Sequence, residues 1–344
     1  MDAFAIYRLP HTSHCTLVGQ CGLPDFFQSL HDLGNEPGFV MAPFTCSAAA
    51  PLLLIRPDVI RHCSPADVVS MNDLTCHLHG TDVSAAKADT EVYHNDFSRF
   101  HEAFSSTAIK KLVLARSTDV IHRGTDPLQL FGRACERYPE AFVTLISAPQ
   151  CGTWLMATPE VLLAQEQDTW RTMALAGTMR YAEKLPSWSD KNVREQAYVA
   201  QYISDCLSRY SDDVTMNGPY TTRAGMLVHL RTDFSFTLRA GVPVGHLLDT
   251  LHPTPAVCGL PKQEAHRFIL ANESIDRSYY SGFSGPMQVE GDTALFVSLR
   301  CMRILDDRYR LFAGGGILPQ SEESQEWDET VAKMQAMLSI IKEL

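Results

Sequence analysis

The stretch from residue 311 to residue 334 constrains the fold and chemistry of this chain more than any other. It begins as an apolar strand end, runs through three consecutive glycines at 314–316, and ends in a helix whose first turns are rich in acids. Glycines permit backbone conformations and close approaches that a Cβ would forbid, so we predict a turn pressed against a ligand. Ser321 or Ser324 is the expected cap of the helix that follows.

Two acids and one lysine form a row on this helix. Glu326, Glu329 and Lys333 are spaced i, i+3 and i+7, which places them on one face. The row either points toward the glycines and a ligand, or belongs to a solvated helix start where acids favour the positive end of the dipole. The pattern alone leaves both interpretations open.

Charge and composition exclude several classes of function. The formal net charge of −11 argues against a nucleic-acid partner and against an anionic membrane surface. An anionic substrate would therefore need local cations or a metal. No run of 18 apolar residues and no signal segment is present, so we expect a cytoplasmic protein. The 10 cysteines are scattered without a CxxC pair, which favours free thiols.

Regular elements are predicted from hydrophobic periodicity and turn residues. Short strands separated by turns are expected over residues 1–95. Helices are predicted at 96–105, 126–138, 189–210, 244–251 and 263–272, and strands at 110–121, 141–147, 153–158, 225–230 and 233–238. A β-hairpin of 294–305 and 309–313 is expected to lead into the glycines.

Several charged residues stand among apolar ones. Lys111 begins a strand, where a lysine is either a charged residue at an exposed sheet edge or a catalyst. Glu160 lies between two apolar pieces and is either an exposed turn acid or a buried acid with a raised pKa. Glu195 shares its helix face with apolar residues, so it must be paired or metal-bound. His229 reads by itself as a core histidine, and Arg300, in mid-strand, requires a carboxylate partner.

Taken together, seven motifs resemble the chorismate-utilising enzymes, a family that includes isochorismate, salicylate, anthranilate and aminodeoxychorismate synthases. The matching motifs are KLVLAR (111–116), TPEVLL (158–163), ALAGTMR (174–180), KNVRE (191–195), HPTPAVCGLP (252–261), SLR (298–300) and the segment from AGGGILPQ to EWDETVAK (313–333). They occur in the family's order from residue 111 onward, whereas the N-terminal third carries little of the resemblance.

The resemblance implies an α+β fold, with large antiparallel β-sheets packed face to face and helices outside. It implies a single chorismate-binding catalytic domain over residues 1–344, with a less regular part at 1–95 and a motif-bearing core at 96–344. It also implies a Mg²⁺ cofactor held by Glu195 and Glu329, with Glu326 nearby. Carboxylate oxygens suit this hard cation, which would help to neutralise a dianionic substrate.

The same resemblance implies a set of substrate-binding residues. Those expected to contact chorismate, mainly its carboxylates, are Gly177, Thr178, His229, Ala256, Val257, Arg300, Gly314 and Lys333. Gln196 departs from the family pattern, since relatives often have a histidine after the metal-binding glutamate.

Single positions indicate the reaction within the family. Lys111 stands where isochorismate and salicylate synthases have a lysine general base, and Ala176 stands where aminodeoxychorismate synthases have a nucleophilic lysine. We therefore predict an isochorismate synthase, an isomerase in which Lys111 activates water to attack C2 of chorismate. Glu160 would protonate the departing C4 hydroxyl. The product would serve menaquinone or siderophore biosynthesis, and no glutamine amidotransferase partner is expected.

Three other functions compete with this interpretation. A salicylate synthase would form isochorismate and then eliminate pyruvate. A non-catalytic homologue would bind chorismate without turnover, although the presence of both Lys111 and Glu160 argues against it. A nucleotide site at the glycines lacks the GxxxxGK[ST] motif.

Overall fold

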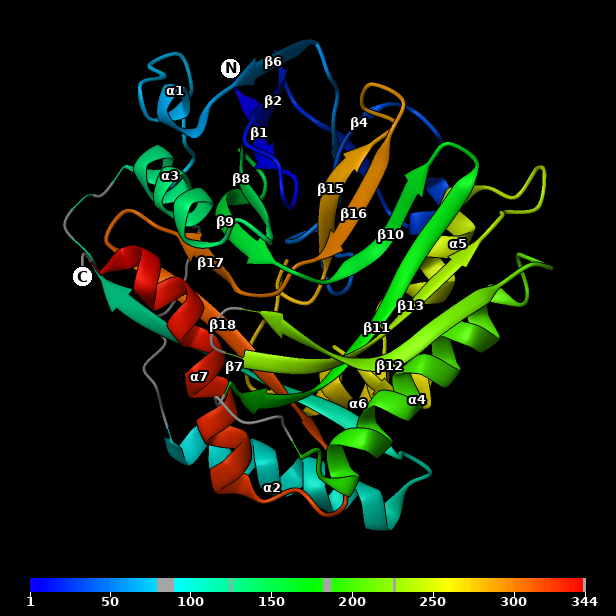
Figure 1. Ribbon diagram of the computed structural model, residues 1–344. Helices are drawn as coiled ribbons and strands as arrows, with labels where there is room; N and C mark the ends of the chain where they lie inside the picture. Colours follow the sequence, from blue (N-terminus) through cyan, green and yellow to red (C-terminus); the bar gives the residue numbers. More distant parts are fainter. Residues whose placement is uncertain (79–89, 123, 125, 182–186, 225–226, 343–344) are drawn as a thin grey trace.

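The computed structural model describes residues 1–78, 90–122, 124, 126–181, 187–224 and 227–342. Within these residues the chain forms two antiparallel sheets of nine strands each. The sheets face one another and the helices lie mainly around their outer sides (Figure 1). The predicted α+β architecture is confirmed. No helix in the described part of the chain is both long and apolar enough to cross a membrane.

The first sheet holds the strand that carries Lys111. Its spatial order is β14 (Gly259–Leu260), β7 (Lys111–Ile121), β18 (Arg308–Ile317), β17 (Cys301–Ile304), β9 (Gly152–Thr158), β8 (Phe142–Ala148), β1 (Ala3–Arg8), β2 (Cys15–Gln20) and β6 (Val59–Cys63). β7 pairs with β18 over ten residue pairs, from Ile121 opposite Arg308 to Leu112 opposite Ile317. On its other side β7 pairs with the two-residue strand β14, which lies opposite Lys111 and Leu112.

The second sheet holds the strands that carry the other predicted binding residues. Its order is β12 (Thr215–Ala224), β13 (Leu227–Phe236), β11 (Thr169–Arg180), β10 (Val161–Glu166), β16 (Thr293–Val297), β15 (Phe283–Met287), β4 (Gly38–Ala42), β5 (Leu52–Ile55) and β3 (Asp25–Phe27). The N-terminal strands thus join both sheets. Residues 1–63 complete the β framework on which the motif-bearing part depends.

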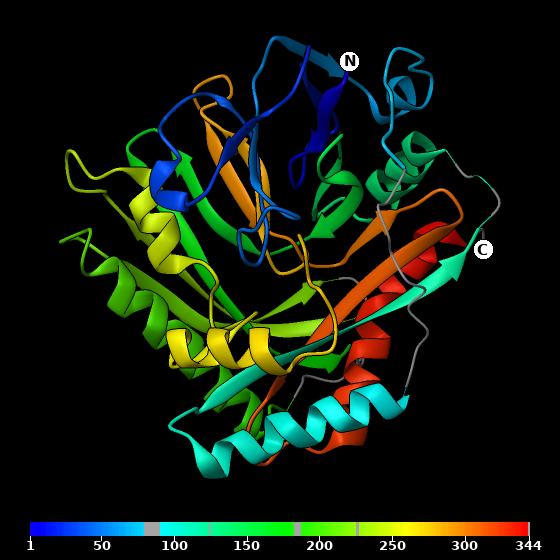
Figure 2. The same cartoon turned by 180° about the vertical axis from the view of Figure 1, so that it is seen from behind.

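Helices cover the outer faces of the sheets (Figures 1 and 2). They are α1 (Pro65–Val69), α2 (Thr90–Ser106), α3 (Pro127–Arg137), α4 (Asp190–Leu207), α5 (Val244–Leu251), α6 (Lys262–Asn272) and α7 (Glu323–Ile341), with a short 3₁₀ turn at Leu30–Asp32. α3 and α7 pack on the first sheet, α4 and α5 on the second, and α2 and α6 beside β7.

The core between the sheets is rich in aromatic residues. Phe142 of the first sheet stacks on Phe296 of the second, with ring centroids 4.2 Å apart. Trp154 contacts Tyr279 edge-on at 5.7 Å and is fully buried. Such rings remove large apolar areas from water, which is the main contribution to stability at this interface.

The predicted hairpin into the glycines is confirmed in its second half, because β17 pairs with β18 from Ile304 opposite Tyr309 to Met302 opposite Leu311. The single strand predicted over 294–305 is wrong. The strand ends at Val297 and the chain resumes at Cys301, but β16 belongs to the second sheet and β17 to the first. Arg300 lies in this crossover with a φ of 45°, so the chain bends there instead of staying extended. The crossover places Arg300 between the two sheets.

Two further local predictions need correction. The glycines at 314–316 lie inside β18 and pair with β7, so they form no turn. α7 begins after Glu322, which makes no side-chain cap, and Ser321 instead accepts a hydrogen bond from the amide of Leu318. The two strands predicted at 225–230 and 233–238 form one strand, β13, from residue 227, while residues 225–226 lie outside the described residues.

Candidate active site

Most of the predicted site residues line one small cavity of about 40 Å³. The predicted residues around it are Glu160, Gly177, Thr178, Glu195, His229, Ala256, Val257, Arg300, Gly314, Glu329 and Lys333. They come from both sheets, from α4 and α7, and from the segment between α5 and β14. Residues separated by more than 170 positions in sequence are therefore brought together.

Lys111 lies beside this cavity at the start of β7. Its side chain is fully buried, and its Nζ lies 3.1 Å from Oε1 of Glu195. β14 covers this end of the strand, because Leu260 pairs with Lys111. Lys111 is therefore not a charged residue at an exposed sheet edge. Burial acts to raise the pKa of Glu195, but the ammonium groups of Lys111 and Lys191 outweigh it and lower that pKa.

The glycines of β18 make this close arrangement possible. A Cβ on Gly316 would lie 2.0 Å from Oε1 of Glu195 and 3.3 Å from Cε of Lys111. A Cβ on Gly314 would lie 2.9 Å from the Tyr280 hydroxyl. The prediction of a close approach was correct, but what approaches the strand is the set of functional side chains.

Glu160 is a buried acid, as the resemblance required. It lies in the two-residue link between β9 and β10 and is 3 % exposed. Burial raises its pKa from 4.5 to about 7, although Arg300, Lys111 and Lys333 act to lower it. Of the two interpretations, the exposed turn acid is therefore wrong, and both Pro159 and Glu160 line the cavity. A carboxyl group that keeps its proton near neutral pH can act as a general acid.

A histidine and a bulge face the same cavity. Gly177 has a φ of 71°, and the pairing of β11 with β13 shifts register there. The shift sets Thr178 opposite His229, whose Nδ1 lies 3.3 Å from the Thr178 hydroxyl. Burial, followed by Arg300 and Lys333, lowers the pKa of His229 to about 3, so the ring is neutral. Its Nε2 has no hydrogen-bond partner among the described residues.

Three acids near the cavity each contact a lysine. Glu195 pairs with Lys111, Glu326 pairs with Lys191, and Oε1 of Glu329 lies 2.6 Å from Nζ of Lys333. Lys333 also donates to the carbonyl of Gly314 at 2.7 Å. The solvated reading of the α7 acids is wrong for Glu326, which is only 1 % exposed.

The acids fit a hard divalent cation in their donor chemistry. Carboxylate oxygens are the ligands that Mg²⁺ prefers. Oε2 of Glu326 is buried without a hydrogen-bond partner in the described part of the chain, and burial raises the pKa of this group. Gly315 lies close to both Glu326 and Glu329, because a Cβ there would lie 3.1 Å from Oε2 of Glu326 and 3.9 Å from Oε1 of Glu329. Among the described residues, no three His, Cys, Asp or Glu side chains are already grouped as a metal site.

Glu326 does not line the small cavity but lines a larger hollow beside it, of about 440 Å³. The two spaces share Thr178 and Glu329, and the hollow is also lined by Lys191 and Asn192. The pair of Lys191 and Glu326 thus lines the outer hollow, next to Glu329, which lines both spaces. The hollow and the cavity are therefore adjacent.

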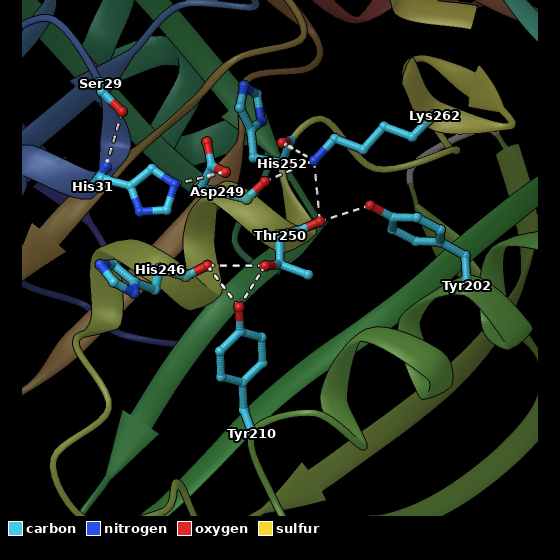
Figure 3. A network of polar contacts seen from close by, with 9 residues as sticks. All are labelled: Ser29, His31, Tyr202, Tyr210, His246, Asp249, Thr250, His252 and Lys262. Atoms are coloured by element: carbon cyan, nitrogen blue, oxygen red, sulfur yellow. Dashed lines mark hydrogen bonds and ion pairs between the residues drawn. The ribbon is translucent and has the colours of Figure 1, made fainter. Parts of the chain in front are cut away.

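Ala256 and Val257 belong to a rigid wall. It follows α5, whose end is held by the side chain of Lys262 (Figure 3). Nζ of Lys262 donates to the carbonyls of Asp249, at 2.7 Å, and Thr250, at 3.0 Å, and also to that of His252. A cation at the carbonyl end of a helix is favourable. Ala256 and Val257 of this proline-containing segment thus line the cavity.

Gln196, which departs from the family pattern, has a structural role. It is 1 % exposed, accepts a hydrogen bond from the amide of Ala176 at 2.9 Å, and donates to the carbonyl of Ala174 at 3.1 Å. Its amide therefore fastens α4 to β11 next to Glu195. An amide performs this task with both its donor and its acceptor.

Several residues that line the cavity were not predicted. They are Val113, Pro159, Leu175, Ala176, Tyr280 and Leu299. Val113 shares a strand face with Lys111, so the period of two could have identified it. Tyr280 follows the turn after α6 and carries no local signal, because only tertiary packing brings it here.

The fold and the site define the class of protein. The family model for chorismate binding enzymes matches residues 68–342, so the chain belongs to this family.

Among its relatives, the isochorismate synthase EntC of Escherichia coli K12 is 30% identical over 243 residues, which cover 67% of this chain and 62% of that protein. The isochorismate synthase MenF of the same organism is 30% identical over 244 residues, covering 68% of this chain and 56% of that protein. The alignments span less than two thirds of the length of these relatives.

Solved structures share the fold over nearly the whole chain. A putative 2,3-dihydroxybenzoate-specific isochorismate synthase, DhbC from Bacillus anthracis, superimposes with a TM-score of 0.82 at 24% identity. This match covers 99% of this chain and 96% of that one. The menaquinone-specific isochorismate synthase MenF of Escherichia coli gives 0.81 at 22% identity, covering 99% and 89%. The N-terminal third, which carried little of the sequence resemblance, therefore shares the fold.

Proposed function

We propose that this chain is a Mg²⁺-dependent isochorismate synthase, which converts chorismate to isochorismate. The observation that carries the proposal is the placement of a buried lysine and a buried acid with a pKa of about 7 around one cavity. Acid–base catalysis needs both a proton acceptor and a proton donor near the reacting bonds. The names of the relatives agree with this activity.

Cations on the cavity wall suit a substrate with two carboxylates. Arg300 and Lys333 both line the cavity. Arg300 comes from the crossover between the two sheets, and Lys333 comes from α7. Each can donate charge-assisted hydrogen bonds, and Arg300 can do so in a bidentate manner. The amides at the Gly177 bulge and the neutral His229 would complete the polar contacts to the substrate.

In the proposed reaction, the amine of Lys111 accepts a proton from water as the water oxygen bonds to C2. The ring double bonds shift, the C4–oxygen bond breaks, and Glu160 gives its proton to the departing hydroxyl, which leaves as water. Atoms and charges balance, because one water enters and one leaves. The reverse reaction exchanges the two roles. Since water is the nucleophile, no ammonia supply from an amidotransferase is required.

Glu195, Glu329 and Glu326 would hold the metal ion. Bound Mg²⁺ would supply positive charge that offsets a substrate carboxylate. The ion pairs of these acids with lysines have to loosen for this, so the lysines become available to the substrate and to the reaction. This follows from charge balance, because each carboxylate is then neutralised by the metal instead.

The cavity must open for substrate to enter. A volume of about 40 Å³ is far below the ~300 Å³ or more that small-molecule sites usually enclose. The adjoining hollow of about 440 Å³ provides the space outside the pair of Lys191 and Glu326. We therefore expect the ends of α4 and α7 to move apart on binding.

The direct test is purified protein with chorismate, with and without Mg²⁺, and product identification by NMR. Isochorismate formed only with Mg²⁺ supports the proposal. Salicylate with pyruvate would instead indicate a salicylate synthase, and chorismate binding without product would indicate a non-catalytic homologue. The relatives are named for menaquinone and for vibriobactin, and we propose that the product enters one of these two kinds of pathway.

A further inference from the structure

We propose that Arg277 is a positioning residue that fixes the strand of the general base relative to the proline-containing wall. Arg277 is 3 % exposed and does not line the cavity. Its Nη2 donates to the carbonyl of Val113 at 2.7 Å, and its Nη1 donates to the carbonyl of Val257 at 2.7 Å. Val113 and Val257 both line the cavity. One guanidinium group therefore joins two separate walls of the site from behind.

Glu273 completes this connection. Its carboxylate accepts hydrogen bonds from Nε of Arg277 at 2.6 Å and from Nη2 at 2.7 Å. Oε1 of Glu273 also accepts from the amide of Ala115 at 2.7 Å. The pair is almost completely buried, with side chains 3 % and 2 % exposed. Both ends of the pair thus bind the backbone of β7.

Arg277 and Glu273 bind the edge of β7 just beyond the end of its pairing with β14. β14 pairs with β7 only at Lys111 and Leu112, and the amide of Val113 then donates to the carbonyl of Cys258 at 2.7 Å. Beyond that point the next edge groups of β7, the carbonyl of Val113 and the amide of Ala115, are bound by side chains instead of a strand. Arg277 and Glu273 therefore continue the edge of the sheet that carries Lys111.

A third wall is attached to the same residue. The carbonyl of Arg277 accepts a hydrogen bond from the amide of Tyr280 at 2.8 Å, and Tyr280 lines the cavity. The guanidinium lies 4.3 Å from the ring centroid of Phe44, which follows β4. The plane of the group is therefore held by a ring as well as by hydrogen bonds.

Geometry, not stability, is the quantity that this arrangement controls. A buried ion pair gives little net stability, because desolvation offsets the attraction. A guanidinium, however, holds its donors in a fixed plane and can bind two carbonyls and a carboxylate together. A lysine ammonium has no such fork. Replacing Arg277 by lysine would keep the charge and lose the spacing between β7 and the wall.

The inference rests on the proposed function, since it assigns Lys111 as the base whose position matters. The test compares R277K with R310K. Arg310 on β18 is the control, because its Nε and Nη2 make a similar bidentate contact with Asp119 on β7, at 2.8 and 2.9 Å. Neither Arg310 nor Asp119 lines the cavity. Melting temperature, kcat and KM are measured for both variants at a temperature where both are folded.

We expect the two variants to differ in their kinetics at a temperature where both are folded. For R277K, kcat/KM should fall by about 10²-fold, which is typical of a misplacement near 1 Å in a catalytic site. The fall should appear in kcat, through Lys111, as well as in KM, through Val257. R310K should stay within about threefold of the wild type. Equal kcat/KM values for the two variants would overturn the proposal and leave Arg277 a purely structural residue.

Two further measurements apply if R277K does not fold or if the wild type makes no product. If R277K does not fold, E273Q replaces it, because the amide oxygen still accepts from Ala115 while one bond to Arg277 is lost. The same contrast with R310K is then expected. If the wild type makes no product from chorismate, the proposed function fails, and chorismate affinity is measured by calorimetry. A Kd about tenfold weaker in R277K than in R310K supports positioning, and equal Kd values refute it.

Discussion

Replacing Glu160 by glutamine should make the protein less sensitive to pH. Burial raises the pKa of Glu160 from 4.5 to about 7 in the folded state. The folded protein therefore binds this proton more tightly than the unfolded chain. The stability that this proton contributes is fully present below pH 4.5, decreases as pH rises, and is lost above pH 7. E160Q has no proton to lose at this position.

The size of the effect follows from the two pKa values. One pH unit corresponds to ~1.36 kcal/mol, so the interval from 4.5 to about 7 corresponds to about 3 kcal/mol. The free energy of unfolding of E160Q minus that of the wild type should rise by most of this amount between pH 5 and pH 8. Other titrating groups cancel in this difference.

Urea unfolding followed by circular dichroism at four pH values measures this difference. E136Q, which changes an exposed acid on α3, is the control for the loss of one carboxyl group at the surface. A flat difference for E160Q would refute the account, because Glu160 would then be ionised at neutral pH and unable to act as the acid. In the wild type, kcat/KM should fall above about pH 7 as Glu160 loses its proton.

Three other changes test the remaining parts of the site. Lys111→Ala should lower kcat by about 10²-fold or more in the chorismate assay, since general-base catalysis is lost; near-wild-type turnover would end this assignment. Glu329→Ala should weaken Mg²⁺ binding measured by calorimetry, and an unchanged titration curve would reject Glu329 as a ligand. Gly316→Ala should lower both activity and melting temperature, because its Cβ would lie 2.0 Å from Oε1 of Glu195. A fully active, equally stable variant would show that this close approach is unimportant.

The sequence predicted elements best where one local signal dominated. The helix at 244–251 was predicted with the bounds that α5 has, because its apolar face and flanking prolines agree. β7 also begins and ends within one residue of its prediction. In contrast, the glycines at 314–316 read locally as a turn. Their extended pairing with β7 is a tertiary effect that no local pattern records.

The candidate site was predicted largely through motifs, and its geometry was not. Glu160 and Lys111 each had two readings, because burial depends on which strands cover them and not on neighbours in sequence. The crossover at Arg300 was missed because the apolar residues on both sides of it belong to strands of different sheets. Tyr280 and Arg277 were missed altogether, since their contacts lie far away along the chain.

The central claim is that water, activated by Lys111, attacks chorismate at C2. Turnover in H₂¹⁸O, with the product analysed by mass spectrometry and by ¹⁸O-induced shifts of the carbon NMR signals, tests it most directly. The account predicts isochorismate with one ¹⁸O on C2, and no labelled product from Lys111→Ala. Isochorismate without ¹⁸O would mean that the hydroxyl moves within the substrate, and it would contradict the assignment of Lys111 and Glu160.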